Sequence, residues 1–308
     1  MSDVLAMLGL TQTELDEAVN SKPNVPSRLL VDPMWRERNL TTTSVMIEFV
    51  DGQVNLIPNT SREAAPNTKS FGKGSKVRTF TVPHLPLETH IYASQLQDVR
   101  KAGTKDANAD VVANEIAEHR NRHDATIENL MLGAVKGKIL DADGTTVIYD
   151  LFTEFGVTEP TTNMQFSSAT ADLALTIEQT IRTMKKGLRG DTASGVTVLC
   201  SPEFFDALVT HKSTKDAWLR YQDNVLAREN TNGKFTWKGA VFEIYDYTLG
   251  ETPMIEAGHA HGFLTGMYNG FVRYNAPANM ITEANKLARP FYISTEMGEH
   301  NRGVSIYT

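Results

Sequence analysis

The sequence has little of what several protein classes require. Cys200 is the one cysteine among 308 residues, so no disulfide can form within the chain and a reducing compartment is expected. No apolar run approaches the roughly 20 residues that span a bilayer, so no membrane partner is predicted. The first residues lack the charged and apolar regions of a signal peptide, and we expect none.

The chain also lacks an excess of positive charge. It carries 30 Lys and Arg residues against 37 Asp and Glu residues, a formal net charge of −7. A surface that mainly grips nucleic acid would be basic, whereas a wall that encloses nucleic acid works better when it is mildly repulsive. The composition therefore argues against sequence-specific nucleic-acid binding but not against a protein that surrounds DNA.

Two segments carry few signals of a hydrophobic core. Residues 1–43 are punctuated by prolines and predict an N-terminal arm. Residues 44–57 predict two strands about a turn at Asp51 and Gly52. The segment 60–103 is interrupted by Pro and Gly, and loops longer than about 15 residues are uncommon inside compact domains. We therefore expect this segment to lie on a neighbouring subunit.

A long helix is predicted over residues 106–138. Its expected apolar face steps by three or four residues through Val112, Ile116, Arg120, His123, Ile127, Leu130, Ala134 and Lys138. At 1.5 Å per residue such a helix is roughly 45 Å long. A hairpin over 139–150 follows, turning at Asp143 and Gly144.

The second half of the chain alternates helices and strands. A helix is predicted over 169–186 and a buried strand over 196–200, followed by a helix capped by Ser201 with Pro202 in its first turn. Further strands are predicted at 241–245, 261–264, 271–274, 290–295 and 304–307.

The pattern DxDGT at 141–145 is the sharpest catalytic candidate. In haloacid-dehalogenase phosphatases the first carboxylate is a nucleophile and the second a general acid/base near Mg²⁺, roles that Asp141 and Asp143 would take here. That fold needs a buried strand before the motif, whereas a long helix leads in here. A hairpin turn is the favoured interpretation, and a magnesium-dependent phosphatase remains an alternative.

Other residues of catalytic type have simpler interpretations. His119 and His123 are four apart on the predicted helix, but arginines lie between them and a solvated or interface stripe is favoured over a metal site. His259 and His261 have HxH spacing without an identifiable carboxylate cluster, so no metal or other cofactor is predicted. Cys200 lies at a strand end without an identifiable base, which favours a buried structural thiol over a nucleophile.

The extended segment offers candidate contacts between subunits. The stretch from Lys76 to Val82 alternates polar and apolar residues as a half-exposed strand does. Its basic residues are expected to meet acidic residues of the long helix in the next subunit, although lysines guarding an edge strand would look the same. The candidates are Lys73, Lys76, Val77, Arg78, Phe80 and Val82 on the segment, and Glu115, Glu118 and Glu128 on the helix.

Several stretches in order resemble a known family. They are 44–58, 78–88, 123–128, 137–145 and 200–206, and each is unspecific alone while their order and spacing together are specific. From about residue 30 onward the chain is similar to the lambda-type major capsid proteins of tailed bacteriophages, the phage major capsid protein E family. Encapsulins, cellular compartments with the same fold, remain an alternative.

The resemblance implies the α+β fold called Hong Kong 97-type. It would have an arm at 1–43, a peripheral domain at 44–159 with the extended loop 60–103 and the spine helix 106–138, an axial domain at 160–270, and a return to the peripheral domain at 271–308. The implied protein is a shell-building subunit and not an enzyme.

The resemblance also implies partners and a location. Copies of the chain would form hexamers and pentamers of an icosahedral shell around double-stranded DNA, with a scaffold protein, a portal and in some members a decoration protein. Assembly would occur in the host cytoplasm and the product would be the capsid of the virion.

Overall fold

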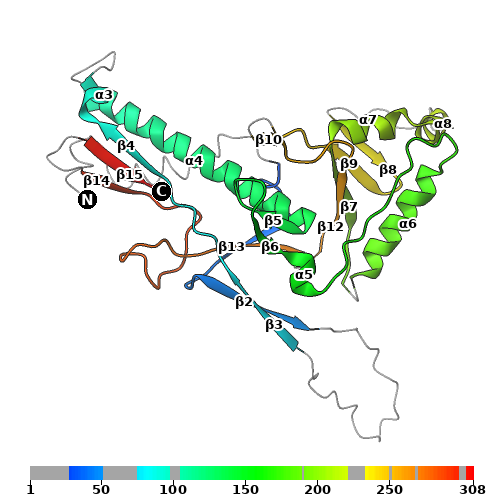
Figure 1. Ribbon diagram of the computed structural model, residues 1–308, viewed down its shortest axis with the longest axis horizontal. Helices are drawn as coiled ribbons and strands as arrows, with labels where there is room; N and C mark the ends of the chain where they lie inside the picture. Colours follow the sequence, from blue (N-terminus) through cyan, green and yellow to red (C-terminus); the bar gives the residue numbers. More distant parts are fainter. Residues whose placement is uncertain are drawn as a thin grey trace, which may run out of the picture. The chain divides into compact units, whose positions relative to one another are not determined.

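The computed structural model describes residues 28–50, 75–97, 105–188, 191–220, 233–249, 252–267, 270–297 and 303–308 (Figure 1). The chain divides into two compact units and passes between them more than once. Unit 1 comprises Met1–Ile47, Thr79–Met131 and Val272–Thr308, and unit 2 comprises Glu48–Arg78 and Leu132–Phe271. Both units contain helices and strands, which confirms the expected α+β class.

Unit 1 is built around one long helix and a small antiparallel sheet. The sheet has the strand order β14-β15-β4, and β1 pairs separately with β13. The described elements are β1 (Trp35–Asn39), β4 (Glu88–Tyr92), α3 (Ala93–Gln97), α4 (Lys105–Lys136), β13 (Phe271–Asn275), β14 (Ser294–Met297) and β15 (Gly303–Tyr307). Strand β4 lies inside the span 60–103, which was expected to form the extended loop. It pairs with β15, so this part of the span belongs to the sheet of unit 1.

The core of unit 1 lies between α4 and the sheet. Val304 on β15 is paired with Ile91 on β4, and both side chains are buried. Together with Ile306 they form one apolar cluster with Val112 and Ile116 of α4. Alternate residues of the strands therefore face the helix, as the two-residue period of a strand requires.

The buried face of α4 differs from the face expected from hydrophobicity. Asp124 is 1% exposed and Glu128 is 3% exposed, although the predicted apolar stripe passed through neither. Arg120 donates to Asp124 at 3.1 Å, so this buried carboxylate has a charged partner. The helix ends at Lys136, two residues before the predicted end, because Gly137 adopts a φ of +86°.

Strands β2 (Ser44–Val50) and β3 (Ser75–Thr81) form a two-stranded ribbon. The backbone N–H of Val82 donates to the carbonyl of Thr43 at 3.0 Å and continues the ribbon by one pair. The second strand of the hairpin predicted at 44–57 lies outside the described residues. Within them, the partner of β2 is β3.

Unit 2 contains a four-stranded sheet flanked by helices (Figure 1). The strand order is β12-β7-β9-β8, with β7 and β9 parallel and the other pairs antiparallel. Its described elements are β5 (Lys138–Leu140), β6 (Val147–Asp150), α5 (Leu151–Phe155), α6 (Leu173–Lys186), β7 (Gly195–Cys200), α7 (Pro202–Thr210), α8 (Lys212–Arg220), β8 (Lys234–Trp237), β9 (Ala240–Ile244), β10 (Thr248–Leu249), β11 (Thr252–Pro253) and β12 (Ala260–Thr265).

Local capping and apolar periodicity explain the helices of unit 2. Ser201 accepts from the backbone N–H of Phe204 and Pro202 occupies the first turn of α7, which confirms the predicted cap. The helix predicted over 169–186 starts later, at Leu173, because Asp172 caps it. Apolar residues of α6 and α7 pack with the sheet in one cluster around Phe242.

Candidate intersubunit surface

The β2–β3 ribbon exposes apolar side chains. Met46 on β2 is 75% exposed and Val77 on β3 is 53% exposed, whereas Phe80 and Val82 are half-buried. An isolated two-stranded sheet is marginal in water, so its apolar side chains gain stability when another surface covers them. Of the apolar candidates on this ribbon, Val77 has the most exposed side chain and is therefore best placed to contact another subunit.

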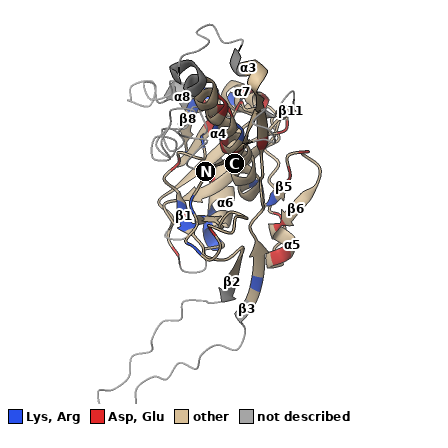
Figure 2. Ribbon diagram, turned by 90° about the vertical axis from the view of Figure 1, so that its left-hand side faces the viewer, with Lys and Arg blue, Asp and Glu red and all other residues tan. Residues whose placement is uncertain are grey.

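Arg78 is already engaged within unit 2. Its Nε donates to the backbone carbonyl of Glu154 on α5 at 3.0 Å and lies 3.7 Å from Oε2 of the same residue. Figure 2 shows basic colouring on β3 and acidic colouring on α5. Because both side chains are about half-exposed, the ion pair contributes at most about 1 kcal/mol. Arg78 fastens the base of the ribbon to α5, a role that sequence reasoning missed.

The candidate lysines are not placed by the structure. Lys73 lies outside the described residues, and Lys76 belongs to β3 but its side chain is not described. The expected charge complementarity between these lysines and another subunit stays a prediction.

The three candidate acids of α4 lie in different surroundings. Glu118 is exposed and pairs with Arg122 one turn later. Glu115 is less exposed and its Oε1 lies 3.7 Å from Nε2 of His119. Glu128 is buried and accepts hydrogen bonds from backbone amides of its own unit. The burial of Glu128 removes the premise on which it was expected to meet a lysine of another subunit.

His119 and His123 bind hydroxyl groups in unit 1. The Nε2 of His119 lies 2.6 Å from the Thr89 hydroxyl and its Nδ1 lies 3.0 Å from the Thr308 hydroxyl, which also contacts Nε2 of His123 at 3.0 Å. Burial lowers the pKa of both imidazoles below the ordinary value. The pair thus joins α4 to β4 and to the residue after β15. Of the two favoured interpretations, a solvated stripe is wrong for the buried His119.

The DxDGT pattern forms the turn of the β5–β6 hairpin, as predicted. Asp143 accepts from the amides of Thr145 and Thr146 and from the Thr146 hydroxyl, and these hydrogen bonds hold the pKa of its carboxyl well below the ordinary range. The strands are antiparallel, and β5 is a short hairpin strand and not the buried strand that a phosphatase would place there. The geometry favours the turn over the phosphatase alternative.

The remaining candidates of catalytic type show no assembled site. Over the described residues, no group of three or more His, Cys, Asp or Glu side chains could hold a metal ion. Burial raises the pKa of the Cys200 thiol to about 12, which keeps it protonated and agrees with a structural thiol. Burial, Lys136 and His259 lower the pKa of His261 to about 4. Of the described helices, none combines the length and apolar character that a bilayer crossing demands.

The comparisons with known proteins include two major capsid proteins of phages that are similar in sequence. The chain is 27% identical over 233 residues to the major capsid protein of Salmonella phage Felix O1, and 25% identical over 217 residues to that of Pseudomonas phage KPP10. These alignments cover 74% and 68% of this chain but 63% and 61% of the two relatives, so the chain spans less than two thirds of their length. The solved capsid of Myoviridae phage XM1 is similar over 94% of this chain and 88% of its own, with 12% identity and a TM-score of 0.46.

The two sequence relatives are structural proteins of bacteriophage heads. The sequence profile of the family Phage major capsid protein E matches residues 11–308. The chain belongs to this family, which confirms the resemblance seen in the sequence. The family match favours a phage capsid protein over the encapsulin alternative.

Proposed function

We propose that copies of this chain assemble into hexamers and pentamers, and that these form the icosahedral head shell around phage double-stranded DNA. The observation that carries the proposal is the β2–β3 ribbon, which presents Met46 and Val77 to solvent on a two-stranded sheet. Covering one such side chain contributes about 1.5–3 kcal/mol at most. Many contacts of this size close a shell without trapping misassembled fragments, because later contacts are effectively intramolecular.

The division of the chain supports an assignment to the parts of a Hong Kong 97-type subunit. The chain leaves unit 1 after Met131 and returns at Val272, close to the return predicted at 271. In this assignment α4 is the spine helix of the peripheral domain, the four-stranded sheet of unit 2 belongs to the axial domain over 160–270, and residues 1–43 are the arm.

The proposed contact set follows the exposure of each candidate. Lys73, Lys76 and Val77 act from the ribbon, with Phe80 and Val82 supporting it. On the long helix Glu118 has the most exposed side chain of the three acids, since Glu115 faces His119 and Glu128 is buried. Arg78 supports the contact indirectly by fastening the ribbon to α5.

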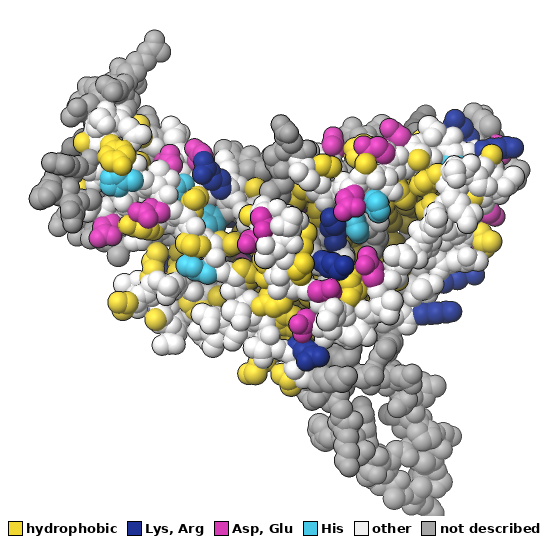
Figure 3. Space-filling view, in the orientation of Figure 1, with side chains coloured by type: hydrophobic (Ala, Val, Ile, Leu, Met, Phe, Trp, Pro, Cys, Tyr) yellow, Lys and Arg dark blue, Asp and Glu magenta, His cyan; other side chains and the backbone are white. Residues whose placement is uncertain are grey.

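The charge of the chain suits a container. With a formal charge of −7 the subunit repels DNA weakly on average, which supports enclosure without sequence-specific binding. Hydrophobic, acidic and basic side chains are interspersed on the face drawn in Figure 3. In this proposal a scaffold protein, a portal and a decoration protein are further partners, assembly takes place in the host cytoplasm, and no step is catalytic.

The test is a charge placed on the ribbon. We expect Val77→Asp to give a folded protein that forms no shells, because a carboxylate there cannot be buried against a neighbour. Val157→Asp is the matched control, since Val157 has the same 53% exposure but lies after α5, outside the ribbon. Electron microscopy and sedimentation of the purified proteins report assembly, and circular dichroism reports folding. Normal shells from Val77→Asp would contradict the proposed contact.

A further inference from the structure

Residues 276–293, which we call the β13–β14 loop, connect these two strands of unit 1 and present apolar side chains to solvent (Figure 1). Ile281 is 99% exposed and Leu287 is 62% exposed. Single exposed apolar residues are ordinary on a protein surface. Ile281 is, however, the most exposed of the large apolar side chains that the structure describes, and it contributes no hydrophobic stabilisation to its own unit. Contact with another surface would supply that stabilisation.

Ion pairs and hydrogen bonds hold the β13–β14 loop in a defined shape. The Glu283 carboxylate lies 3.1 Å from Nη2 of Arg289 and 3.7 Å from Nζ of Lys286. The backbone N–H of Ala288 donates to the carbonyl of Leu40, the residue after β1, at 2.8 Å, and the Ala288 side chain is buried. A surface that is already ordered loses less conformational entropy when a partner covers it. The loop therefore meets a partner as a preformed surface.

The same contacts leave the loop with an excess of positive charge. The side chains of Lys286 and Arg289 are 62% and 56% exposed, whereas that of Glu283, the one acidic residue of the loop, is 13% exposed. The loop thus combines exposed apolar side chains with two cations against one carboxylate. Two copies of the loop would repel each other, so the complementary surface must offer carboxylates beside an exposed apolar side chain.

The β5–β6 hairpin of unit 2 has these properties. Residues 138–150 hold three aspartates and one lysine. Asp141 and Asp143 are exposed at its turn, and Val147, the first residue of β6, is 51% exposed. The hydroxyl and the backbone N–H of Thr146 both donate to the Asp143 carboxylate, which fixes the turn. The hairpin is therefore an acidic and partly apolar surface that is preformed as well.

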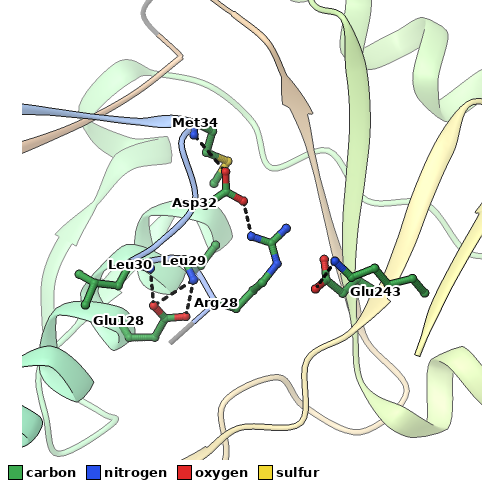
Figure 4. Close-up of polar contacts among 8 residues, drawn as sticks. Arg28, Leu29, Leu30, Asp32, Met34, Glu128 and Glu243 are labelled. Atoms are coloured by element: carbon green, nitrogen blue, oxygen red, sulfur yellow. Dashed lines mark hydrogen bonds and ion pairs between the residues drawn. The ribbon is translucent and has the colours of Figure 1, made fainter. Parts of the chain in front are cut away.

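The acids of α4 do not match the loop in this way. Glu128 is buried, and its carboxylate accepts from the backbone amides of Leu29 and Leu30, each at 2.8 Å (Figure 4). Glu118 is exposed, but over residues 111–136, where the side chains of the helix are described, α4 exposes no large apolar side chain beside it. Charge alone would meet the loop there, whereas the hairpin offers charge and apolar surface together.

We infer that the β13–β14 loop of one copy docks on the β5–β6 hairpin of a second copy. In this contact Ile281 covers Val147, and Lys286 lies opposite Asp141. The inference rests on the proposed function and adds to it a contact that does not involve the β2–β3 ribbon. Because the two surfaces differ, the contact is heterologous, and contacts of this kind generate rings when their rotation closes. It therefore suits the assembly of hexamers and pentamers.

The test joins two copies through introduced cysteines. Ala284→Cys places a thiol on the loop and Ala142→Cys places one on the hairpin turn, both at exposed positions, while Cys200 is buried. The two variants are co-expressed, and the assembled protein is treated with a short bismaleimide. We expect a covalent dimer on a denaturing gel at about tenfold or more the yield from either variant alone, because a contact raises the effective concentration of the two thiols.

Charge reversal gives a second readout. Lys286→Glu is expected to lower the yield of shells about fivefold or more, and adding Asp141→Lys is expected to restore it, because opposite charges then face each other again. A disturbance confined to the loop, where Lys286 lies near Glu283, would not be repaired by a change on the hairpin. Lys215→Glu, at an exposed lysine of α8 outside both surfaces, is the control and should leave the yield unchanged.

The outcomes separate this contact from the proposed function. Shells that form from the two cysteine variants without the mixed dimer would overturn the contact. A dimer from Ala284→Cys alone, in the same yield, would overturn it as well, since it would bring two loops together. A defect of Lys286→Glu that Asp141→Lys leaves unrepaired would count against the pairing of the two surfaces. Failure of the parent protein to form shells under any condition would instead count against the proposed function.

Discussion

Acidification from about pH 8 to about pH 5 is expected to destabilise unit 2 through His261. Burial is the main cause that lowers the pKa of this imidazole from 6.5 to about 4, and the charges of Lys136 and His259 add to it. Lys136 acts on His261 through its charge, and its Nζ is held by donating to the Met254 carbonyl at 3.0 Å. In the folded protein His261 is therefore neutral where an unfolded chain would protonate it.

The sign and size of the effect follow from proton binding. At about pH 5 an imidazole with a pKa of 6.5 is almost fully protonated, whereas one with a pKa of about 4 is about one-tenth protonated. The unfolded state then binds more protons, so stability is fully present above 6.5 and is lost as the pH falls towards 4. Between about pH 8 and about pH 5 the free energy of unfolding falls by about 2 kcal/mol before solvent screening is considered. Because the ring is only partly buried, we expect a loss of about 1–2 kcal/mol.

The assay is urea denaturation over this pH range, with hydrogen exchange of β7 amides to report on unit 2. His261→Gln should lose this part of the pH dependence, while His259→Gln, an exposed neighbour, should keep most of it. His119 and His123 also have a lowered pKa and contribute dependence in unit 1, so the comparison uses the difference between parent and variant. A His261→Gln protein whose unit 2 loses as much stability between about pH 8 and pH 5 as the parent would refute the reasoning.

Two further predictions concern the packing of unit 2. Gly137→Ala should destabilise the protein by more than Gly144→Ala in thermal unfolding. Both positions have a positive φ, so both variants carry a backbone strain of about 1–3 kcal/mol. A Cβ at Gly137 would also lie 2.4 Å from the Phe152 ring, while nothing lies within 4 Å at Gly144, and equal losses of stability would contradict this clash. The Cys200 thiol should resist a disulfide reagent at neutral pH until urea unfolds the protein, because burial raises its pKa to about 12; rapid reaction of the native protein would show that the thiol is accessible.

Local signals predicted the elements whose stability is decided within a few residues. Ser201 and Pro202 announced the start of α7 because a cap and a fixed φ act on the adjacent turn. Asp143 and Gly144 predicted the β5–β6 turn. The Asp143 side chain accepts a hydrogen bond from the turn backbone, and Gly144 adopts the positive φ that the turn requires. The order of such segments was also sufficient to recognise the family, which the profile match confirms.

The candidate site could be predicted only in part. The strand that carries Val77 was predicted because an alternating pattern without a core of its own is visible in the sequence, and the contact of Val77 with another subunit stays a prediction. Glu128 and Glu118 are the same residue type on the same helix, and hydrophobic periodicity does not distinguish a buried acid from an exposed one. Glu128 is buried because two amides of Leu29 and Leu30 receive its charge, and no local pattern places those amides there.

The sequence by itself determined the start of α7, the turn of the β5–β6 hairpin, the lack of internal disulfides and the family of the protein, since these depend on neighbouring residues or on their order. The tertiary structure alone decided which residues meet: the parallel pairing of β7 with β9, the contact of Arg78 with Glu154, and the Thr308 hydroxyl shared by His119 and His123. Contacts between residues far apart in sequence require the chain to close long loops, and they are stable only when burial and hydrogen bonding across the whole unit offset that loss of entropy.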